Sequence, residues 1–533
     1  MISLLVPAEL LVPLVPPHCG MPGFAPNSLR HPRLSVREER DMAVGRIAEP
    51  TDTAPPGTTP AEGGRLGTAS IVFFVVAASA PLTVAAGGLP QSLAVTGVLG
   101  QPLIYLGLAA VLMVFGSGYA AMSRRISGAG AFYAYIAAGL GRATGTGAAF
   151  VALLAYNAMQ VGIAGLFGFT TADFIRAKTG VDVPWWAILL VTVVVVGVLG
   201  FLRIDLNARV LVILLSIETL TVLVFNIAEI ATTHHPLSTE PFTWDAATTG
   251  GVGSAACFAI AGFMGFESGA IYGQECREPR RTVPRATYLA VALIGVFYAF
   301  TSWAMVVGTG TGNAVPMSAK YGPDLLFVLS RDSLGGLFAD FAHLFLITSM
   351  LAALISFHNA VARYFQVLGQ DRALPARLGR THPRFGSPYM GSLAQSALAA
   401  VVVIVFAALG LDPVATLFTW LTNVGAMGVI LLLAATSFSV IVYFRRHDAS
   451  GTTLWSRALA PLVSGAVLAA VFVVIWDNFP VLLGTEGGSP LAWILPGLVI
   501  LCLVVGVAYG LVLKVRRPEV YAVLARGGAD GAA

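Results

Sequence analysis

Two acidic residues lie within long apolar segments, where an ionised side chain is costly and therefore points to function. Glu218 interrupts the apolar run 208–231, and Glu267 follows a glycine-containing stretch in the run 251–274. A carboxyl at Glu218 that takes up and releases a proton could couple proton movement to a conformational change. Glu267 could bind a cationic group, orient the backbone beside it or share a proton. The alternative for both is a neutral carboxyl that only joins helices by hydrogen bonds.

Two apolar segments also contain residues that interrupt a helix. One reads Ala-Ala-Ser-Ala-Pro-Leu at 77–82 and continues with Gly87, Gly88 and Pro90. The other reads Gly-Phe-Met-Gly-Phe-Glu-Ser-Gly at 262–269. Backbone groups opened inside a membrane must be satisfied by protein, ligand or cavity water, so a pair of interrupted spans predicts a binding site near the midplane. The alternative is that the small residues only let helices pack closely.

Two open helix ends suit a zwitterion such as an α-amino acid. Free N–H groups at the first break would face a carboxylate, and free carbonyls at the second would accept hydrogen bonds from an ammonium group. The predicted substrate-binding residues are Ala78, Ser79, Ala80, Pro81, Leu82, Ala261, Gly262, Phe263, Met264, Gly265 and Phe266. Of these, Phe263 and Phe266 could line or gate a side-chain pocket, although packing is the common role of an aromatic residue in a span.

Polar residues on other apolar segments are possible neighbours of this pocket. Each of them could equally make an ordinary interhelical hydrogen bond. They are Tyr156, Asn157, Gln160, Ser349, Ser356, Trp420 and Asn423.

The elements that position these residues are predicted to be membrane-spanning helices. Of the 533 residues, 56% are hydrophobic and 11% are charged, and the mean hydropathy is +0.81, whereas soluble domains have about 25% charged residues. The chain is therefore predicted to be an all-α integral membrane protein with twelve transmembrane helices, of which the first and sixth are discontinuous. The twelve segments lie near 69–92, 102–122, 145–173, 184–202, 208–231, 251–274, 286–308, 338–362, 389–410, 414–443, 457–480 and 489–513.

The basic residues predict how these segments are oriented. Twelve spans place all but four of the 31 Lys and Arg residues on one side of the bilayer, and cytoplasmic loops carry the excess of positive charge. Both termini are therefore predicted to be cytoplasmic, in a multi-pass protein of the plasma membrane. The four residues on the opposite side are Arg176, Lys178, Lys320 and Arg331.

The chain divides into a transporter domain and two tails. Residues 1–66 are rich in Pro, Gly, Thr and Arg and predict a disordered cytoplasmic tail, whose true start could be Met42. Residues 67–515 form the twelve-span domain, and 516–533 form a cytoplasmic C-terminal tail. Breaks five spans apart predict inverted repeats of five spans, about 69–231 and 251–443, followed by two extra spans at 457–513.

Several other functions are disfavoured by what the sequence lacks. No span contains clustered His or Cys residues or paired carboxylates, which disfavours a membrane enzyme and a metal site. No ATP-binding motif is present, and the basic residues form no single patch for nucleic acid. No cofactor is expected, and the oligomeric state is left open.

Three ordered motifs resemble those of the amino acid-polyamine-organocation (APC) permeases. The first spans the exit of the sixth segment, the second lies after the second segment, and the third after the eighth. Glu278, where the family has Asn, and Ser127, where it has Pro, depart from the pattern. The matching residues are Phe263, Met264, Gly265, Phe266, Glu267, Glu275, Pro279, Arg281, Pro284 and Ala286, then 129–135 with Leu140 and Gly141, then Asn359, Arg363, Gly369, Asp371, Arg372, Leu374 and Pro375.

This resemblance covers about residues 65–515 and implies a leucine-transporter-like fold and secondary active transport of amino acids or related amines by alternating access. Symport with protons and exchange both fit this family. A polyamine importer is the first alternative, although it needs at least two acidic contacts and only Glu218 and Glu267 are candidates. A ligand-sensing transceptor or regulatory subunit without net transport is the second alternative.

Overall fold

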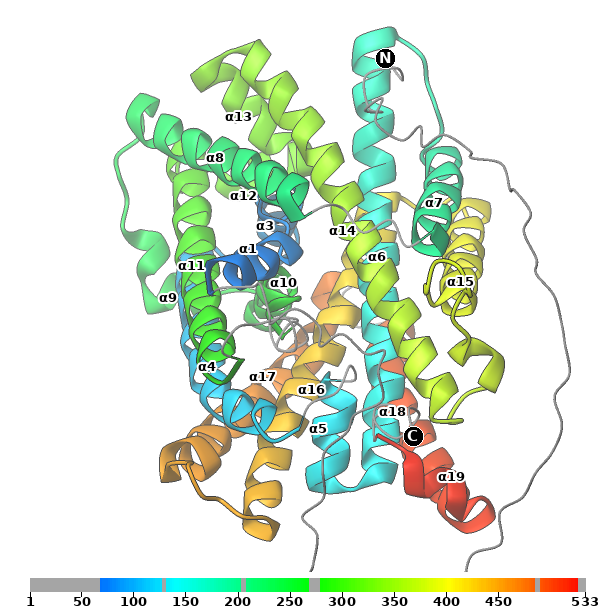
Figure 1. The fold of residues 1–533 in the computed structure, drawn as a ribbon. Coiled ribbons are helices and arrows are strands. Elements are labelled where there is room, and N and C mark those ends of the chain that lie inside the picture. Colours follow the sequence, from blue (N-terminus) through cyan, green and yellow to red (C-terminus); the bar gives the residue numbers. More distant parts are fainter. Residues whose placement is uncertain (1–67, 127–130, 203–207, 268–278, 485–488, 526–533) are drawn as a thin grey trace, which may run out of the picture. The chain divides into compact units, whose positions relative to one another are not determined.

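The computed structural model describes residues 68–126, 131–202, 208–267, 279–484 and 489–525. All of them belong to one compact unit, Pro60–Ala533. The predicted N-terminal tail, 1–66, lies outside the described residues. Over the described ranges the regular structure is helical and contains no β-strand. The prediction of an all-α protein is confirmed (Figure 1).

Ten helices of the described chain are long and apolar enough to cross a membrane. Most begin and end within a few residues of ten predicted segments, although α6, α11 and α14 run further. The two other predicted spans fall on the shorter, interrupted helices described below, so the total of twelve and the five-plus-five repeat stay predictions. The ten are α4 (Gln101–Ser123), α6 (Arg142–Thr179), α7 (Trp185–Leu202), α8 (Ala208–Thr232), α11 (Pro279–Thr309), α14 (Gly336–Gln370), α15 (Tyr389–Ala408), α16 (Thr419–Arg446), α17 (Ala460–Leu482) and α18 (Leu491–Arg516).

The first predicted span is interrupted where the sequence places its proline. Helix α1 ends at Ala78, and the chain resumes as a helix at Pro81. Between them Ala80 has φ 48°, a left-handed conformation that costs a residue with a side chain of order 1–3 kcal/mol. Pro81 has no N–H to offer to a continuous helix. The four pieces are α1 (Thr68–Ala78), α2 (Pro81–Thr83), the π-helical η1 (Val84–Gly88) and α3 (Leu89–Thr96).

The sixth predicted span is interrupted as well. Helix α10 (Val252–Phe263) ends because Met264 takes an extended ψ of 136° and Gly265 a φ of 102°, which glycine alone adopts readily. Residues 268–278, which contain the motif residue Glu275 and the departure at Glu278, lie outside the described residues. Both predicted discontinuities are thus present in the backbone.

Helix α6, with 38 residues, is the longest of the described helices and packs against α5 (Ala131–Leu140), α14, α16 and α18. Glycine allows the closest approach. A Cβ atom on Gly162 would lie 2.7 Å from the Thr422 side chain on α16. Small residues at such crossings are the usual means by which membrane helices come close.

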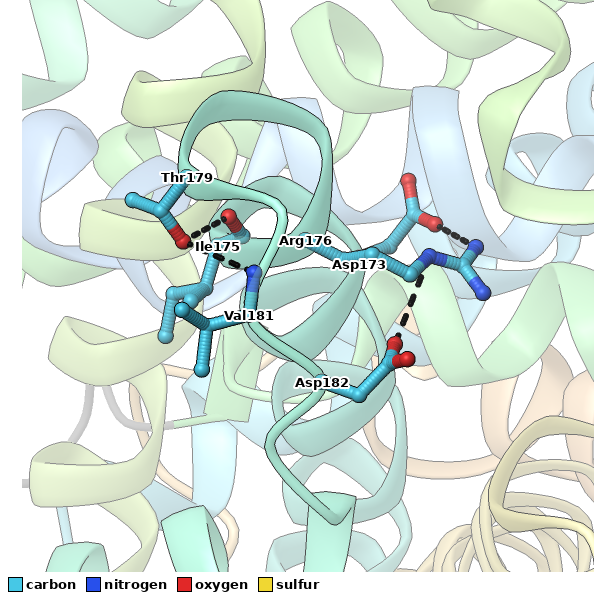
Figure 2. Close-up of polar contacts among 6 residues, drawn as sticks. All are labelled: Asp173, Ile175, Arg176, Thr179, Val181 and Asp182. Carbon is cyan, nitrogen blue, oxygen red and sulfur yellow. Dashed lines mark hydrogen bonds and ion pairs between the residues drawn. The ribbon is translucent and has the colours of Figure 1, made fainter.

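The end of α6 is fixed by charges and hydroxyl groups (Figure 2). Arg176 lies between two carboxylates, 2.6 Å from Asp173 and 4.0 Å from Asp182. Thr179 donates to the Ile175 carbonyl, and cations in this last turn also favour the negative end of the helix dipole. Lys178 pairs with Asp340 near the start of α14, which joins the ends of these two helices.

Several shorter elements were not predicted from the sequence. The connection between α11 and α14 folds as α12 (Ala314–Tyr321), η4 (Gly322–Asp324) and α13 (Leu325–Leu334), and it packs against α3 and η1. Part of the predicted C-terminal tail forms α19 (Pro518–Val523), which packs on α18. The others are α9 (Trp244–Thr248) and the single turns η2 (Glu240–Phe242) and η5 (Ala376–Gly379). Two predicted spans also begin with a π-helical turn, η6 (Pro413–Phe418) before α16 and η7 (Trp455–Leu459) before α17.

Candidate functional site

A small cavity lies where the two interrupted spans meet α6, α14 and α16. Its volume is about 40 Å³, and since one water needs about 10–15 Å³, it has room for about three waters. Its lining is mostly apolar and carries three hydroxyl groups. The lining residues are Ser79, Ala80, Thr83, Val84, Gly88, Met159, Ile163, Phe258, Ala261, Gly262, Phe357, Phe418 and Thr422.

Four residues predicted from the two breaks line this cavity together. Ser79 and Ala80 come from the interruption between α1 and α2, and Ala261 and Gly262 from the last turn of α10. The first N–H groups of a helix and its last carbonyls have no partners within the helix. The start of α2 and the end of α10 therefore meet at one cavity, where Pro81 has no N–H to donate and the Ala261 carbonyl accepts from the Met264 N–H.

Six other residues predicted at the breaks do not line the cavity. Pro81 and Leu82 are buried within α2, and Ala78 is the last residue of α1. Phe263 packs against Tyr105 of α4, with ring centroids 6.1 Å apart, and Phe266 meets Phe115 of the same helix edge to face. Both phenylalanines thus contact α4. Met264 and Gly265 form the end of α10 and are not part of the lining either.

Tyr298 of α11 supports the first break. Its hydroxyl donates to the Ser79 carbonyl at 3.0 Å and lies 3.2 Å from Ser79 Oγ. Ser79 Oγ donates its own proton to the Val76 carbonyl of α1 at 2.7 Å. The open backbone between α1 and α2 is therefore held by a neighbouring helix, as interrupted membrane helices require.

Glu267 is buried beside the end of α10, where its carboxyl accepts two hydrogen bonds. One comes from the Tyr156 hydroxyl on α6, and the other from the Gly265 N–H at 3.0 Å. The Glu267 carbonyl accepts a third hydrogen bond from Tyr119 of α4 at 3.1 Å. Glu267 thus joins the interrupted span to α6 and α4, and it is not among the residues that line the cavity.

Glu218 reaches the cavity through two hydroxyl groups. Its carboxyl accepts a hydrogen bond from Ser349 of α14 at 2.7 Å, and Ser349 Oγ lies 3.4 Å from Thr83 Oγ1, which lines the cavity. The chain of contacts joins α8, α14 and α2. Glu218 is 6% exposed, so a buried carboxyl is linked to the cavity by hydroxyl groups.

The residues predicted as pocket neighbours on other spans lie in different parts of the structure. Ser349 donates a hydrogen bond to Glu218, and Tyr156 donates one to Glu267, whereas Ser356 is exposed on α14. Asn157 and Asn423 donate to carbonyls one turn earlier in their own helices, and each leaves a buried side-chain oxygen without a partner among the described residues.

Gln160 and Trp420 also lie away from the cavity lining. Gln160 accepts a hydrogen bond from Gln395 of α15 and lies 3.5 Å from His358 Nδ1. Trp420 packs against Phe406 of α15, with ring centroids 6.4 Å apart. These two residues join the surrounding helices to one another.

The sequence analysis missed most of the apolar lining. Met159 and Ile163 lie one and two turns from Tyr156 on α6, and Phe258 lies one turn before Gly262 on α10. Helical spacing from residues already chosen would have found them. Among the described residues no group of three His, Cys, Asp or Glu side chains is placed to hold a metal ion.

Comparison with known proteins places this fold among transporters. An uncharacterised transporter of Mycobacterium tuberculosis is 29% identical over 39% of this chain and 43% of its own length. The low-affinity putrescine importer PlaP of Escherichia coli is 24% identical over 42% of this chain and 47% of its own length. The chain thus spans less than half of either relative.

A solved structure shares the fold over most of both chains. The crystal structure of a mutant of the Eremococcus coleocola manganese transporter matches with a TM-score of 0.52 and 16% identity, and covers 84% of this chain and 95% of that one. The amino acid permease family model matches residues 72–520, which is most of the sequence. Its members are permeases and not enzymes. The chain therefore belongs to the amino acid permease family.

Proposed function

We propose that this protein moves amino acids across the plasma membrane by alternating access, with both termini in the cytoplasm. The observation that carries the proposal is the cavity between the start of α2 and the end of α10, because two helix ends beside one cavity suit the carboxylate and ammonium groups of a compact zwitterion. The Thr83 side chain adds a hydroxyl group to the carboxylate end, while the Ser79 hydroxyl donates to the Val76 carbonyl.

Transport is driven by protons through Glu218. The path from the cavity to this carboxyl runs through Thr83 and Ser349, so the occupancy of the cavity and the protonation of Glu218 can influence each other. Thr83, Ser349 and Glu218 lie on α2, α14 and α8. A change in the contacts between these three residues therefore alters how an interrupted span packs against two continuous ones. Such a contact between elements is what coupling needs.

Uptake of labelled amino acids into proteoliposomes, with and without an inward proton gradient, tests both parts of the proposal. Wild-type protein accumulates the label only with the gradient. Glu218→Gln keeps the hydrogen-bonding shape but cannot ionise, so it exchanges label across the membrane without accumulating it.

Glu229→Gln is the matched control. Glu229 also lies on α8, is buried, and accepts a hydrogen bond from a serine hydroxyl, Ser333, at 2.7 Å, but neither of these two residues lines the cavity. It should keep gradient-driven uptake. Unchanged accumulation by Glu218→Gln would remove the proton role from Glu218, and no uptake of any amino acid or amine by the wild type would overturn transport itself.

A further inference from the structure

The side-chain wall of the cavity is defined by five apolar residues from four elements. Met159 and Ile163 come from α6, Phe258 from α10, Phe357 from α14 and Phe418 from η6. All but Ile163 and Met159 are aromatic, and each of the five is less than 9% exposed. They lie around the same cavity as the two open helix ends. A ligand held by its carboxylate and ammonium groups at those ends would place its side chain against this wall.

The cavity offers no charged partner to such a side chain. Among the described residues that line it, none is Asp, Glu, Lys, Arg or His. The carboxyls of Glu267 and Glu218 lie outside this lining, where Glu267 accepts from Tyr156 and Gly265 and Glu218 accepts from Ser349. A second ammonium or a guanidinium group would lose its water here without gaining a counter-ion, which is strongly unfavourable.

The size of the cavity sets a second limit. Its volume of about 40 Å³, room for about three waters, suits a compact side chain better than a long one. The packing behind it is close, since a Cβ atom on Gly262 would lie 3.2 Å from the Tyr298 ring and 3.4 Å from Val84. The walls therefore cannot retreat easily at this end of α10.

We infer that the substrate is a neutral amino acid with a small, uncharged and mainly apolar side chain, which lies against the wall formed by Met159, Ile163, Phe258, Phe357 and Phe418. This inference rests on the proposed function. The inferred substrate class excludes polyamines and amino acids with cationic side chains. The five wall residues limit the length of the side chain that a substrate can have. Shortening Met159 opens space in this wall with little change of the helix backbone, because its side chain is unbranched and flexible.

Uptake of labelled alanine, valine, leucine, phenylalanine, lysine and putrescine by the full chain in proteoliposomes tests the substrate class. Alanine and valine should be taken up, and lysine and putrescine should be at least about 100-fold poorer substrates because their second charge lacks a partner. Uptake of lysine or putrescine comparable with that of valine would overturn the inference and leave the proposed function intact. If none of the six compounds accumulates but another amino acid does, the inference fails. If no amino acid or amine accumulates, the proposed function fails.

Met159→Ala tests the wall separately. The shorter side chain should raise kcat/KM for leucine or phenylalanine relative to alanine by about tenfold, the effect of one to two methylene-sized groups in an apolar pocket. Met305→Ala is the matched control, because this methionine of α11 is equally buried but does not line the cavity. It should leave the ratio unchanged. An unchanged ratio in Met159→Ala would show that this wall does not limit the side chain.

Discussion

The carboxyl of Glu267 fixes the end of the interrupted helix α10 by hydrogen bonds, one of which comes from Tyr156. The carboxyl is 2% exposed, and its two donors among the described residues are the Tyr156 hydroxyl and the Gly265 N–H. The hydroxyl comes from α6 and the N–H from the chain just after α10. Glu267 therefore has a positioning role, through which α6 determines where the second break lies.

Tyr156→Phe removes the hydroxyl and keeps the ring. The buried carboxyl then loses one of these two partners, which should destabilise the protein by about 1–3 kcal/mol. Thermal unfolding in detergent would measure the loss of stability. Uptake assays should also show a higher KM for the substrate. Tyr105→Phe is the control, since Tyr105 is a buried tyrosine of α4 whose ring packs on Phe263 and Tyr298. Equal effects of the two substitutions would contradict the role given to Tyr156.

At the residue scale the sequence pointed to the site through its breaks and missed the wall. Ser79, Ala80, Ala261 and Gly262 could be chosen because proline and glycine are out of place in a membrane helix. Phe263 follows Gly262 directly, and one residue along a helix turns a side chain by about 100°, which carries it to α4. Met159, Phe258 and Phe418 are apolar residues in apolar helices, and composition alone gives no signal to separate them from packing residues.

The connection formed by α12, η4 and α13 rests on the first interrupted span. Its η4 turn packs against η1 and α3, and Asp324 ends that turn. Burial, and then the nearby Asp173, raises the pKa of Asp324 to about 6, while Arg176 opposes the rise. The folded protein thus holds this proton to a higher pH than the unfolded chain does.

The stability of the protein should therefore fall as the pH rises from about 4 to about 6, because the folded state binds more protons in this window. In Asp324→Asn this contribution is absent, so its melting temperature relative to wild type should rise across the same window and then level off. Asp182→Asn changes an exposed carboxylate that also contacts Arg176, and it should follow the wild type. Parallel curves for wild type and Asp324→Asn would contradict the assignment.

The C-terminal segment after α18 docks on the ends of α5 and α14. The Ala525 N–H and the Tyr133 hydroxyl both reach the Asp371 carboxylate, at 2.9 Å each. Val520 and Leu524 are buried in a small cluster that also contains Tyr133, Leu368 and Leu513. The segment therefore joins the ends of several helices.

Leu524→Ala should cost about 2–5 kcal/mol of stability, since the leucine is 1% exposed. The neighbouring Val523 is 40% exposed, and Val523→Ala should change the stability by less than about 0.5 kcal/mol. Thermal unfolding of the two variants in the same detergent would measure the difference. Equal melting temperatures would mean that the segment does not contribute to the fold.

At the element scale the long helices were the most predictable part. A span must carry about 20 apolar residues, and this requirement marks each end clearly. Helices α5, α12 and α13 were not predicted because they are too short to span a membrane and pack against helices distant in the sequence, such as α16 for α5 and α3 for α12. The motif residues Tyr133 and Asp371 were recognised only by resemblance, and the hydrogen bond between them joins two segments 238 residues apart, which no local pattern reveals.

For the molecule as a whole, family membership and the two interrupted helices agree on a transporter architecture. The remaining question is whether the cavity between the breaks is where substrate binds. Gly88 lines this cavity, and an added Cβ atom there would meet only Val84 Cγ1, at 3.7 Å. The backbone at this position therefore has room for a Cβ atom, and we expect the rest of the leucine side chain in Gly88→Leu to fill the cavity.

The most direct test of the central claim is saturable uptake of a labelled amino acid by Gly88→Leu in proteoliposomes. Gly107→Leu is the control, since this glycine lies on α4, away from the cavity, with no neighbouring atom of the described residues within 4 Å of an added Cβ. Both variants should fold with melting temperatures close to that of the wild type. Gly88→Leu should lose uptake, whereas Gly107→Leu should keep it. Wild-type KM and kcat in Gly88→Leu would contradict substrate binding in this cavity.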